Sequence, residues 1–308
     1  MPRVLSFLLF VALLFVTISG EALFCEVFAQ KPALAQNGAA PASPVKLTLP
    51  MKDGSVRFAA IGDTGTGGKG QQQIADMMIR YWQVFPFEFV LMMGDNMYGG
   101  ESPKDFVEKF SGVYKPLLDN KVKFYAALGN HDLALQANYE HFNMNGKEYY
   151  RFKKGNVAFY ALNSTYMDQK QVKWLQEQLA LDTSEWKVCF LHHAPYSSAK
   201  SHGSDEELRK VVEPIFVRHG VNLVLTGHDH VYERIKPQNG IYYFVSGAAG
   251  KLRKGDIKRS SPLTDKAFDT DLHFMLFEVV DDQLYFQTIS RTGETIDTGV
   301  MARQKAKK

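Results

Sequence analysis

Five short blocks of polar residues in this chain each follow directly after a run of apolar residues. They are Gly62-Asp63-Thr64-Gly65, Gly94-Asp95-Asn96-Met97-Tyr98, Gly129-Asn130-His131-Asp132, Leu191-His192-His193 and Gly227-His228-Asp229-His230. A short apolar run that ends abruptly predicts a buried strand, so we expect each block to lie on the loop that leaves a strand. Together the blocks offer carboxylate, phenol, amide and imidazole groups, which are metal ligands. The sequence therefore predicts strands whose ends converge on ligands for two adjacent metal ions.

The spacing of apolar and polar stretches predicts the fold class. Strands are expected at 56–61, 87–93 and 123–128, with helical stretches at 71–81, 104–110 and 114–118 between them. This alternation is typical of parallel β-α-β units. The second half repeats it, with a hairpin at 149–162, helices at 168–181 and 205–219, and strands at 188–191, 221–226, 242–246, 273–280 and 284–290. We predict an α/β protein built as a four-layer sandwich of two mixed β-sheets flanked by helices.

The first 50 residues have the composition of a processing segment followed by a linker. Arg3 supplies a small positive charge, and residues 4–19 form an uncharged apolar run that is short for a membrane span. Ala33-Leu34-Ala35 provides a small-residue cleavage site, with residues 27–29 as an earlier alternative. We predict a signal peptide at 1–35, a linker at 36–50, the folded domain at 51–300 and a solvated basic tail at 301–308. A secreted or periplasmic location follows, with an uncleaved anchor as the alternative.

The cysteines and the net charge exclude some classes of protein. Cleavage after Ala35 removes Cys25 and leaves Cys189 without a disulfide partner. Phe24 is bulky where a lipoprotein signal needs a small residue, which argues against lipid attachment at Cys25. Cys189 lies in an apolar run, so we expect a buried hydrophobic side chain rather than a nucleophile. A formal net charge of +3 over 308 residues, without a dense basic stripe, predicts no nucleic-acid partner.

Particular residues in the blocks indicate what kind of metal site they form. The carboxylates Asp63 and Asp95 both follow strands and should project at the carboxyl ends of neighbouring strands. His228 and His230, two residues apart after a strand, would be costly to bury without a partner. Asn130 offers a neutral amide oxygen, which limits the negative charge of a crowded site. A phenol such as Tyr98 binds a metal only when a strongly acidic ion, such as ferric iron, takes its proton.

In this order, the five blocks resemble the motifs of the purple acid phosphatases, a branch of the calcineurin-like metallophosphoesterase superfamily. The family pattern DxG, GDxxY, GNH(D/E), VxxH and GHxH is matched over residues 56–234, and GHDHVYER at 227–234 resembles the plant members. Cys189 stands where the fourth motif usually has Val. Gly65 stands where the wider superfamily commonly has a histidine, and the combination of Gly65 with Tyr98 separates the purple branch from its relatives.

The resemblance implies a metallophosphoesterase fold and a dinuclear centre. A site for Fe(III) would be formed by Asp63, Asp95, Tyr98 and His230, and a site for Fe(II), Zn(II) or Mn(II) by Asp95, Asn130, His192 and His228, with Asp95 bridging. His192 is preferred to His193 because Trp186 and Tyr196 then fall at the offsets seen in the family.

The same resemblance implies a secreted acid phosphatase. It would hydrolyse phosphomonoesters by attack of a metal-bound hydroxide, while His131 and His202 orient the phosphate and protonate the leaving oxygen. The alternative is a phosphodiesterase, pyrophosphatase or nucleotide phosphatase on the same centre. The expected partners are small phosphorylated substrates, with no nucleic acid and no stable membrane insertion after signal cleavage.

Two other classes of protein compete with this interpretation, and one further segment stays ambiguous. Residues 65–70 fit the pattern GxGxxG of a dinucleotide-binding loop, but Asp63 just before them would repel a pyrophosphate. A non-catalytic binding protein on the same scaffold is disfavoured because all seven expected ligands are present. The basic residues between 251 and 259 form either a solvated loop or a surface that steers anionic substrates.

Overall fold

The computed structural model describes residues 45–303. The predicted signal peptide at 1–35, its cleavage sites, Cys25 and most of the predicted linker lie outside the described residues. Within residues 45–303, no helix is both long and apolar enough to cross a membrane.

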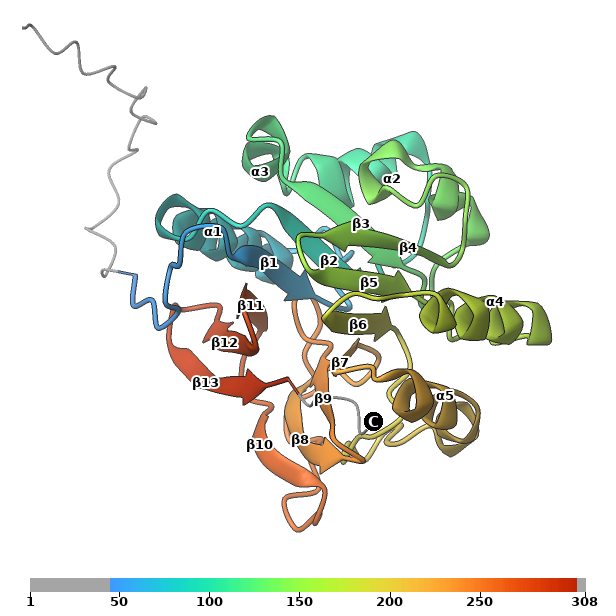
Figure 1. Cartoon of the computed structure of the whole chain (residues 1–308). Coiled ribbons are helices and arrows are strands. Elements are labelled where there is room, and N and C mark those ends of the chain that lie inside the picture. The colour runs from blue at the N-terminus through green and yellow to red at the C-terminus, as the bar shows by residue number, and fades with distance from the viewer. Residues whose placement is uncertain (1–44, 304–308) are drawn as a thin grey trace, which may run out of the picture. The chain divides into compact units, whose positions relative to one another are not determined.

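The strands of the described residues form two mixed sheets (Figure 1). The first sheet has the order β13-β12-β11-β1-β2-β3. Its strands β1 (Val56–Ile61), β2 (Phe89–Met93) and β3 (Lys123–Ala127) are parallel, with Phe58 opposite Phe89 and Phe89 opposite Lys123. The antiparallel strands β11 (His273–Val280), β12 (Gln283–Ser290) and β13 (Thr295–Ala302) extend the other side.

The second sheet has the order β10-β8-β9-β7-β6-β5-β4. Its parallel centre consists of β5 (Val157–Ala161), β6 (Trp186–Leu191), β7 (Leu223–Thr226) and β9 (Ile241–Ser246). The strands β4 (Tyr150–Lys154), β8 (Tyr232–Gln238) and β10 (Thr264–Phe268) pair antiparallel at its edges. The carboxyl ends of β6 and β7 therefore lie side by side, as those of β1, β2 and β3 do in the first sheet.

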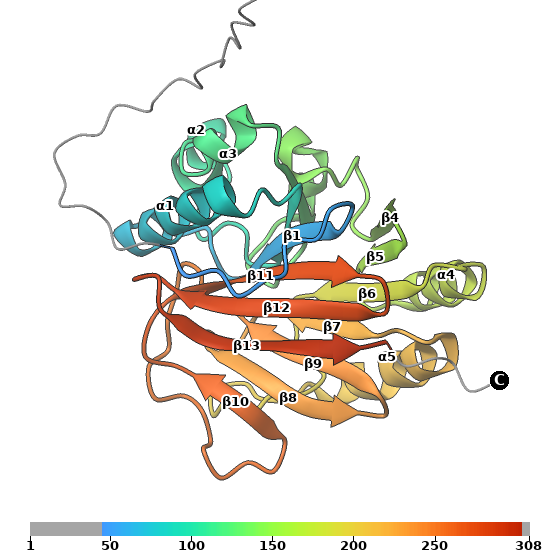
Figure 2. The same ribbon diagram turned by 60° about the vertical axis from the view of Figure 1, so that its left-hand side comes forward.

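The two sheets face each other across a core rich in aromatic rings, and Figure 2 shows β11 to β13 lying over β7 to β9. Phe58 of β1 meets Phe159 of β5 with ring centroids 5.3 Å apart, and Phe244 of β9 meets Phe286 of β12 at 5.0 Å. These side chains are almost completely buried. Burial of each such ring contributes on the order of 2–3 kcal/mol, so the contact between the sheets is a major source of stability.

Helices cover the outer faces of both sheets (Figure 1). On the first sheet lie α1 (Lys69–Val84), α2 (Pro103–Phe106) with the π-turn at Val107–Ser111, and α3 (Lys115–Asp119). On the second lie α4 (Gln169–Ala180) and α5 (Glu206–His219), whose apolar residues pack against Cys189 and Val224. Short 3-10 turns at Ala134–Asn138 and Glu140–Phe142 connect β3 to β4. The predicted four-layer sandwich is confirmed, and Cys189 is fully buried as expected.

Three strands were not predicted, and each lies at or beside a sheet edge. β8, β10 and β13 contain Glu, Arg, Lys, Asp and Gly, with few consecutive apolar residues. An edge strand has one neighbour and little buried surface, so its sequence need not show the apolar pattern that reveals a central strand.

Candidate metal centre

All five polar blocks lie on loops at the carboxyl ends of parallel strands. The loops after β1 and β2 are tied together because the Asp63 N–H donates to the Gly94 carbonyl at 3.1 Å. The two sheets are tied in the same region, since His192 Nδ1 at the end of β6 lies 3.0 Å from the Met93 carbonyl oxygen of β2. Residues from five separate segments are thereby brought to one end of the sandwich.

Three of the expected ligands have left-handed backbone conformations, with φ of 55° at Asp63, 49° at Asp95 and 69° at His228. This region is sparsely populated by residues other than glycine and costs on the order of 1 kcal/mol or more at each position. The turn it produces directs the side chain away from the strand and across its end. Such strain is characteristic of functional sites.

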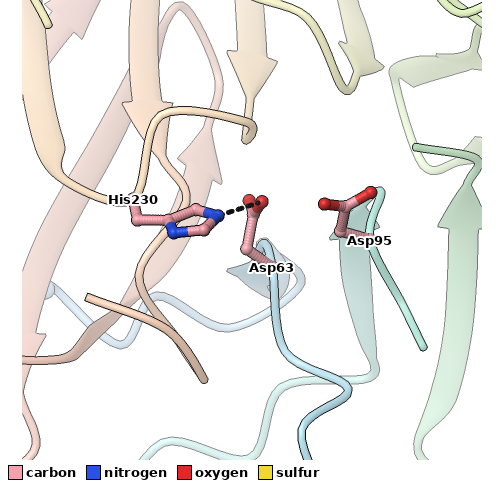
Figure 3. Close-up of side chains that lie close together, drawn as sticks. All are labelled: Asp63, Asp95 and His230. Carbon is pink, nitrogen blue, oxygen red and sulfur yellow. Dashed lines mark ion pairs between the residues drawn. The ribbon is translucent and has the colours of Figure 1, made fainter. Parts of the chain in front are cut away.

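A first group of side chains surrounds Asp63. Asp63 Oδ1 lies 3.2 Å from the Tyr98 hydroxyl, which donates to it, and 3.3 Å from His230 Nε2. The Tyr98 hydroxyl is also 3.3 Å from His230 Nε2. Figure 3 shows Asp63, Asp95 and His230 turned toward a common space, and one ligand atom from each lies within 4.8 Å of the others. This group contains the four residues expected for Fe(III).

A second group surrounds His192. Its Nε2 lies 3.0 Å from Asn130 Oδ1, 3.1 Å from His228 Nδ1 and 3.4 Å from Asp95 Oδ1. Asp95 therefore belongs to both groups. His193 turns away and its Nδ1 lies 2.9 Å from the Ser164 hydroxyl, so the geometry favours His192 over His193 as the ligand.

Burial favours the uncharged form of the ionisable side chains in both groups. It lowers the pKa of His192 well below the usual value, and it lowers that of His228 to about 2 with the neighbouring His192 contributing. Both imidazoles are therefore neutral, with a lone pair to donate. Burial, and then the charge of Asp95, raise the pKa of Asp63 well above its usual range. Burial followed by the charge of Asp63 also raises the pKa of Tyr98.

The donor set fits cations of two kinds. Two carboxylates buried side by side carry a repulsion that a multivalent cation would remove, and such a cation would also release the phenol proton of Tyr98. The first group is dominated by oxygen donors, which suit a hard trivalent ion, whereas the second has two imidazoles and two oxygens, which suit a divalent transition metal.

His131 and His202, the two histidines expected to act on the substrate, lie beside different groups of ligands. Both are exposed. The ring of His131 lies 5.1 Å from that of Tyr98, and the ring of His202 lies 4.1 Å from that of His228. Each imidazole is therefore accessible to a molecule bound over the cluster.

Comparison with known proteins identifies the family. The model of the calcineurin-like phosphoesterase family matches residues 56–232, more than half of the chain. The chain belongs to this family. Purple acid phosphatase 17 of Arabidopsis thaliana is 28% identical over 244 residues, which cover 67% of this chain and 71% of that protein. Tartrate-resistant acid phosphatase type 5 of Oryctolagus cuniculus is 29% identical over 248 residues, covering 66% and 76%. The curated relatives are thus acid phosphatases, and the dinucleotide-binding alternative is excluded.

Solved structures share the fold of this phosphoesterase. The purple acid phosphatase PPD1 from yellow lupin seeds superposes with a TM-score of 0.69 at 17% identity, covering 82% of this chain and 54% of that one. GAP50, described as the anchor in the inner membrane complex of Plasmodium, superposes with a TM-score of 0.71 at 21% identity, covering 82% and 90%. At these identities the likeness concerns the fold alone.

Two aspartates that connect the ligand loops, Asp132 and Asp229, were not singled out from the sequence of this phosphoesterase. Asp132 accepts hydrogen bonds from the backbone N–H groups of Gly129, Asn96 and Met97, which joins the loops after β2 and β3. Asp229 accepts one from Ser197 Oγ at 2.6 Å, which ties the segment before His202 to the loop after β7. In the sequence, the only indication of these structural roles is that Asp132 and Asp229 each lie inside a block of expected ligands.

Gly65 is required by the way Tyr98 enters the site. A Cβ atom at Gly65 would lie 1.9 Å from the Asn96 carbonyl oxygen, and the Tyr98 N–H donates to the Gly65 carbonyl at 2.9 Å. The loop that carries Tyr98 therefore occupies the space that any side chain at position 65 would need. This explains in physical terms why a glycine, and no histidine, accompanies Tyr98.

We predict that Gly65→Ala lowers the free energy of unfolding by about 3 kcal/mol, because the new methyl group must displace a buried backbone segment. Gly68→Ala is the matched control on the same loop: φ is −88°, and a Cβ would meet nothing closer than 3.4 Å. We expect this variant to lose no more than about 1 kcal/mol, since Gly68 is only a helix N-cap. Urea unfolding of both variants measures the difference, and equal losses would contradict the packing argument.

Proposed function

We propose that this phosphoesterase is a purple acid phosphatase that hydrolyses phosphomonoesters at a dinuclear Fe(III)–M(II) centre, with Fe(II), Zn(II) or Mn(II) as M(II). The observation that carries the proposal is the contact of the partly buried Tyr98 hydroxyl with both Asp63 Oδ1 and His230 Nε2. A phenol in this position is a ligand for a strongly acidic trivalent ion and has no role at a site for divalent ions alone.

The proposal assigns Asp63, Tyr98 and His230 to the ferric ion and Asn130, His192 and His228 to the divalent ion, with Asp95 shared. Bound cations would hold the phosphoryl oxygens and lower the pKa of a water molecule so that it becomes a nucleophile at mild pH. The chain itself sets the geometry. Asp95 is held by the N–H of His131, which donates to its Oδ1 at 3.0 Å, so the bridging carboxylate and this histidine are positioned together.

We assign His131 and His202 to the substrate. His131 stands beside Tyr98 and His202 beside His228, so the two imidazoles flank a phosphate bound over the cluster from its two groups. Either can donate a hydrogen bond to a phosphoryl oxygen, and His202 is assigned to protonate the leaving oxygen. A general acid in this role contributes typically about 10²–10⁴-fold to the rate.

The proposal extends to the organisation of the chain. The apolar run after Arg3 and the Ala33-Leu34-Ala35 sequence support a signal peptide at 1–35, and hence secretion or export to the periplasm. The segment 36–50 would be a linker, 51–300 the catalytic domain and 301–308 a basic tail, with Leu49 packed into the core and β13 running on to Ala302.

Turnover of different phosphoesters tests the activity. We expect the purified protein to hydrolyse 4-nitrophenyl phosphate at acidic pH, and to hydrolyse the diester bis(4-nitrophenyl) phosphate at least about tenfold less efficiently in kcat/KM. Asp95→Ala removes a ligand shared by both ions and should abolish both reactions. A preference for the diester would replace this proposal with the phosphodiesterase alternative.

Colour tests the ferric assignment. Protein purified without added metal should absorb in the visible range because a tyrosinate bound to Fe(III) gives a charge-transfer band, and metal analysis should find iron. Tyr98→Phe should remove the band and leave the fold intact. Tyr166→Phe, at an exposed tyrosine outside the cluster, is the control that should keep the band. A colourless, iron-free protein with full activity would disprove the Fe(III) site.

Leaving groups of different basicity test His202. We predict that His202→Ala lowers kcat by about 10²-fold on β-glycerophosphate, whose alkoxide needs a proton, and much less on 4-nitrophenyl phosphate. His141→Ala is the matched control because this histidine is partly exposed and lies in the turn Glu140–Phe142, outside both groups. Equal losses of His202→Ala on the two substrates would exclude proton donation by His202.

A further inference from the structure

Two basic side chains beside the first group of ligands have no acidic partner among residues 45–303. They are Lys251 and Arg253, on the loop after β9. Lys251 Nζ lies 3.4 Å from the centroid of the Tyr98 ring. Arg253 Nη1 is buried and makes no hydrogen bond within the described chain. Arg259, further along the same loop, differs from both because it forms an ion pair with Asp269.

The loop that carries these two residues is packed tightly against the ligand loops. A Cβ atom at Gly250 would lie 2.0 Å from the Thr64 carbonyl oxygen, so only glycine lets the chain pass this close to the loop after β1. The Ala249 N–H donates to the Gly62 carbonyl at 3.1 Å, and the Arg253 N–H donates to the His230 carbonyl at 3.0 Å. Lys251 and Arg253 are therefore held in place beside the cluster, which a solvated basic loop would not require.

The buried end of the Arg253 side chain lacks an acceptor among the described residues. A buried guanidinium nitrogen without an acceptor is unfavourable by on the order of 1–3 kcal/mol, and more when the group is charged. Its planar donors fit the oxygens of a phosphate or carboxylate. The described chain supplies no such group to Arg253. An anion bound from solution would provide the missing acceptor.

We propose that Lys251 and Arg253 form a second anion site, which binds a further phosphate group of the substrate next to the phosphate that reacts. The inference rests on the proposed function, because the reacting phosphate is taken to lie over the two groups of metal ligands. The second anion site makes compounds with adjacent phosphates, such as inorganic pyrophosphate and nucleoside diphosphates, better substrates than monoesters of uncharged alcohols. The neighbouring exposed residue Lys254 has no part in this site.

The reaction on such a substrate consumes one water molecule. The water oxygen forms a bond to the terminal phosphorus, and the bond from that phosphorus to the bridging oxygen breaks. The departing phosphate keeps the electron pair of that bond and takes up the proton released by water. Lys251 and Arg253 hold the departing phosphate, whose negative charge increases as the bond breaks, so they favour the transition state as well as binding.

Direct binding to the metal-loaded enzyme tests the site without turnover. The probes are methylenediphosphonate, which has two adjacent phosphonates and a non-hydrolysable bridge, and orthophosphate, which has one group. We expect Lys251→Gln and Arg253→Gln each to weaken methylenediphosphonate binding about tenfold by isothermal titration calorimetry, and to change orthophosphate binding less than about twofold. Metal content measured after each titration checks that the probe has not removed the ions.

Lys254→Gln is the matched control, since it removes the same charge from the adjacent position of the loop. A loss in this variant as large as in Lys251→Gln would mean that net charge alone attracts the anion, and would overturn the proposal. Equal weakening of orthophosphate and methylenediphosphonate would also overturn it, because the residues would then serve the reacting phosphate. Arg253→Lys covers the case in which Arg253→Gln fails to fold, and should weaken the diphosphonate by a smaller factor.

Kinetics then separate the second anion site from the proposed function. In Lys251→Gln, kcat/KM for pyrophosphate should fall about tenfold more than kcat/KM for 4-nitrophenyl phosphate, and equal losses on the two substrates would contradict the second anion site. If the wild-type protein hydrolyses neither compound, the proposed function fails, whereas the calorimetric comparison of the two probes still decides whether the second anion site exists.

Discussion

Two carboxylates buried side by side, Asp63 and Asp95, impose the main physical constraint on this structure. They lie at the ends of adjacent parallel strands, and both side chains are shielded from water. Their mutual repulsion raises the pKa of Asp63 on top of the effect of burial. The neutral imidazoles and the phenol around them cannot balance two negative charges. The cluster is therefore built for cations, and the strained backbone at three of its residues is tolerated because the sheets fix the strand ends.

Polar groups outside the expected ligand set link the loops that carry this cluster. Asp132 joins two ligand loops through backbone N–H groups, and Asp229 joins the loop after β7 to the segment that leads to His202. Glu233, fully buried, accepts a hydrogen bond from the Ser198 N–H in that same segment. Across the sandwich, Tyr232 and Arg234 of β8 both donate to Asp297 of β13, which ties the edges of the two sheets together. Hydrogen bonds between loops and between strands thus link the ligand loops to one another and the edges of the two sheets to each other.

The basic residues on the loop after β9 have different environments that their sequence does not reveal. In the sequence the Lys and Arg residues of this loop look alike. Their spacing does not show which of them forms a salt bridge and which lies beside the metal centre. In the folded chain Arg259 is neutralised by Asp269, while Lys251 lies over the Tyr98 ring and Arg253 is left without an acceptor. The difference depends on Gly250 packing against Thr64, a contact between segments nearly two hundred residues apart.

The sequence by itself determined the central strands, the α/β class and the candidate ligands, because apolar runs that end in metal-binding residues reflect local chemistry. It also indicated His192, although His193 beside it has the same side chain. Only the tertiary structure decided which atoms meet: that Asp95 lies in both groups, that Gly65 makes room for the loop of Tyr98, and that His193 turns to Ser164. These outcomes depend on how two sheets pack and which loops then touch, which no local pattern encodes. For the same reason the strands β8, β10 and β13, which lie at or beside a sheet edge and are stabilised by long-range pairing rather than by their own apolar pattern, became visible only in the folded chain.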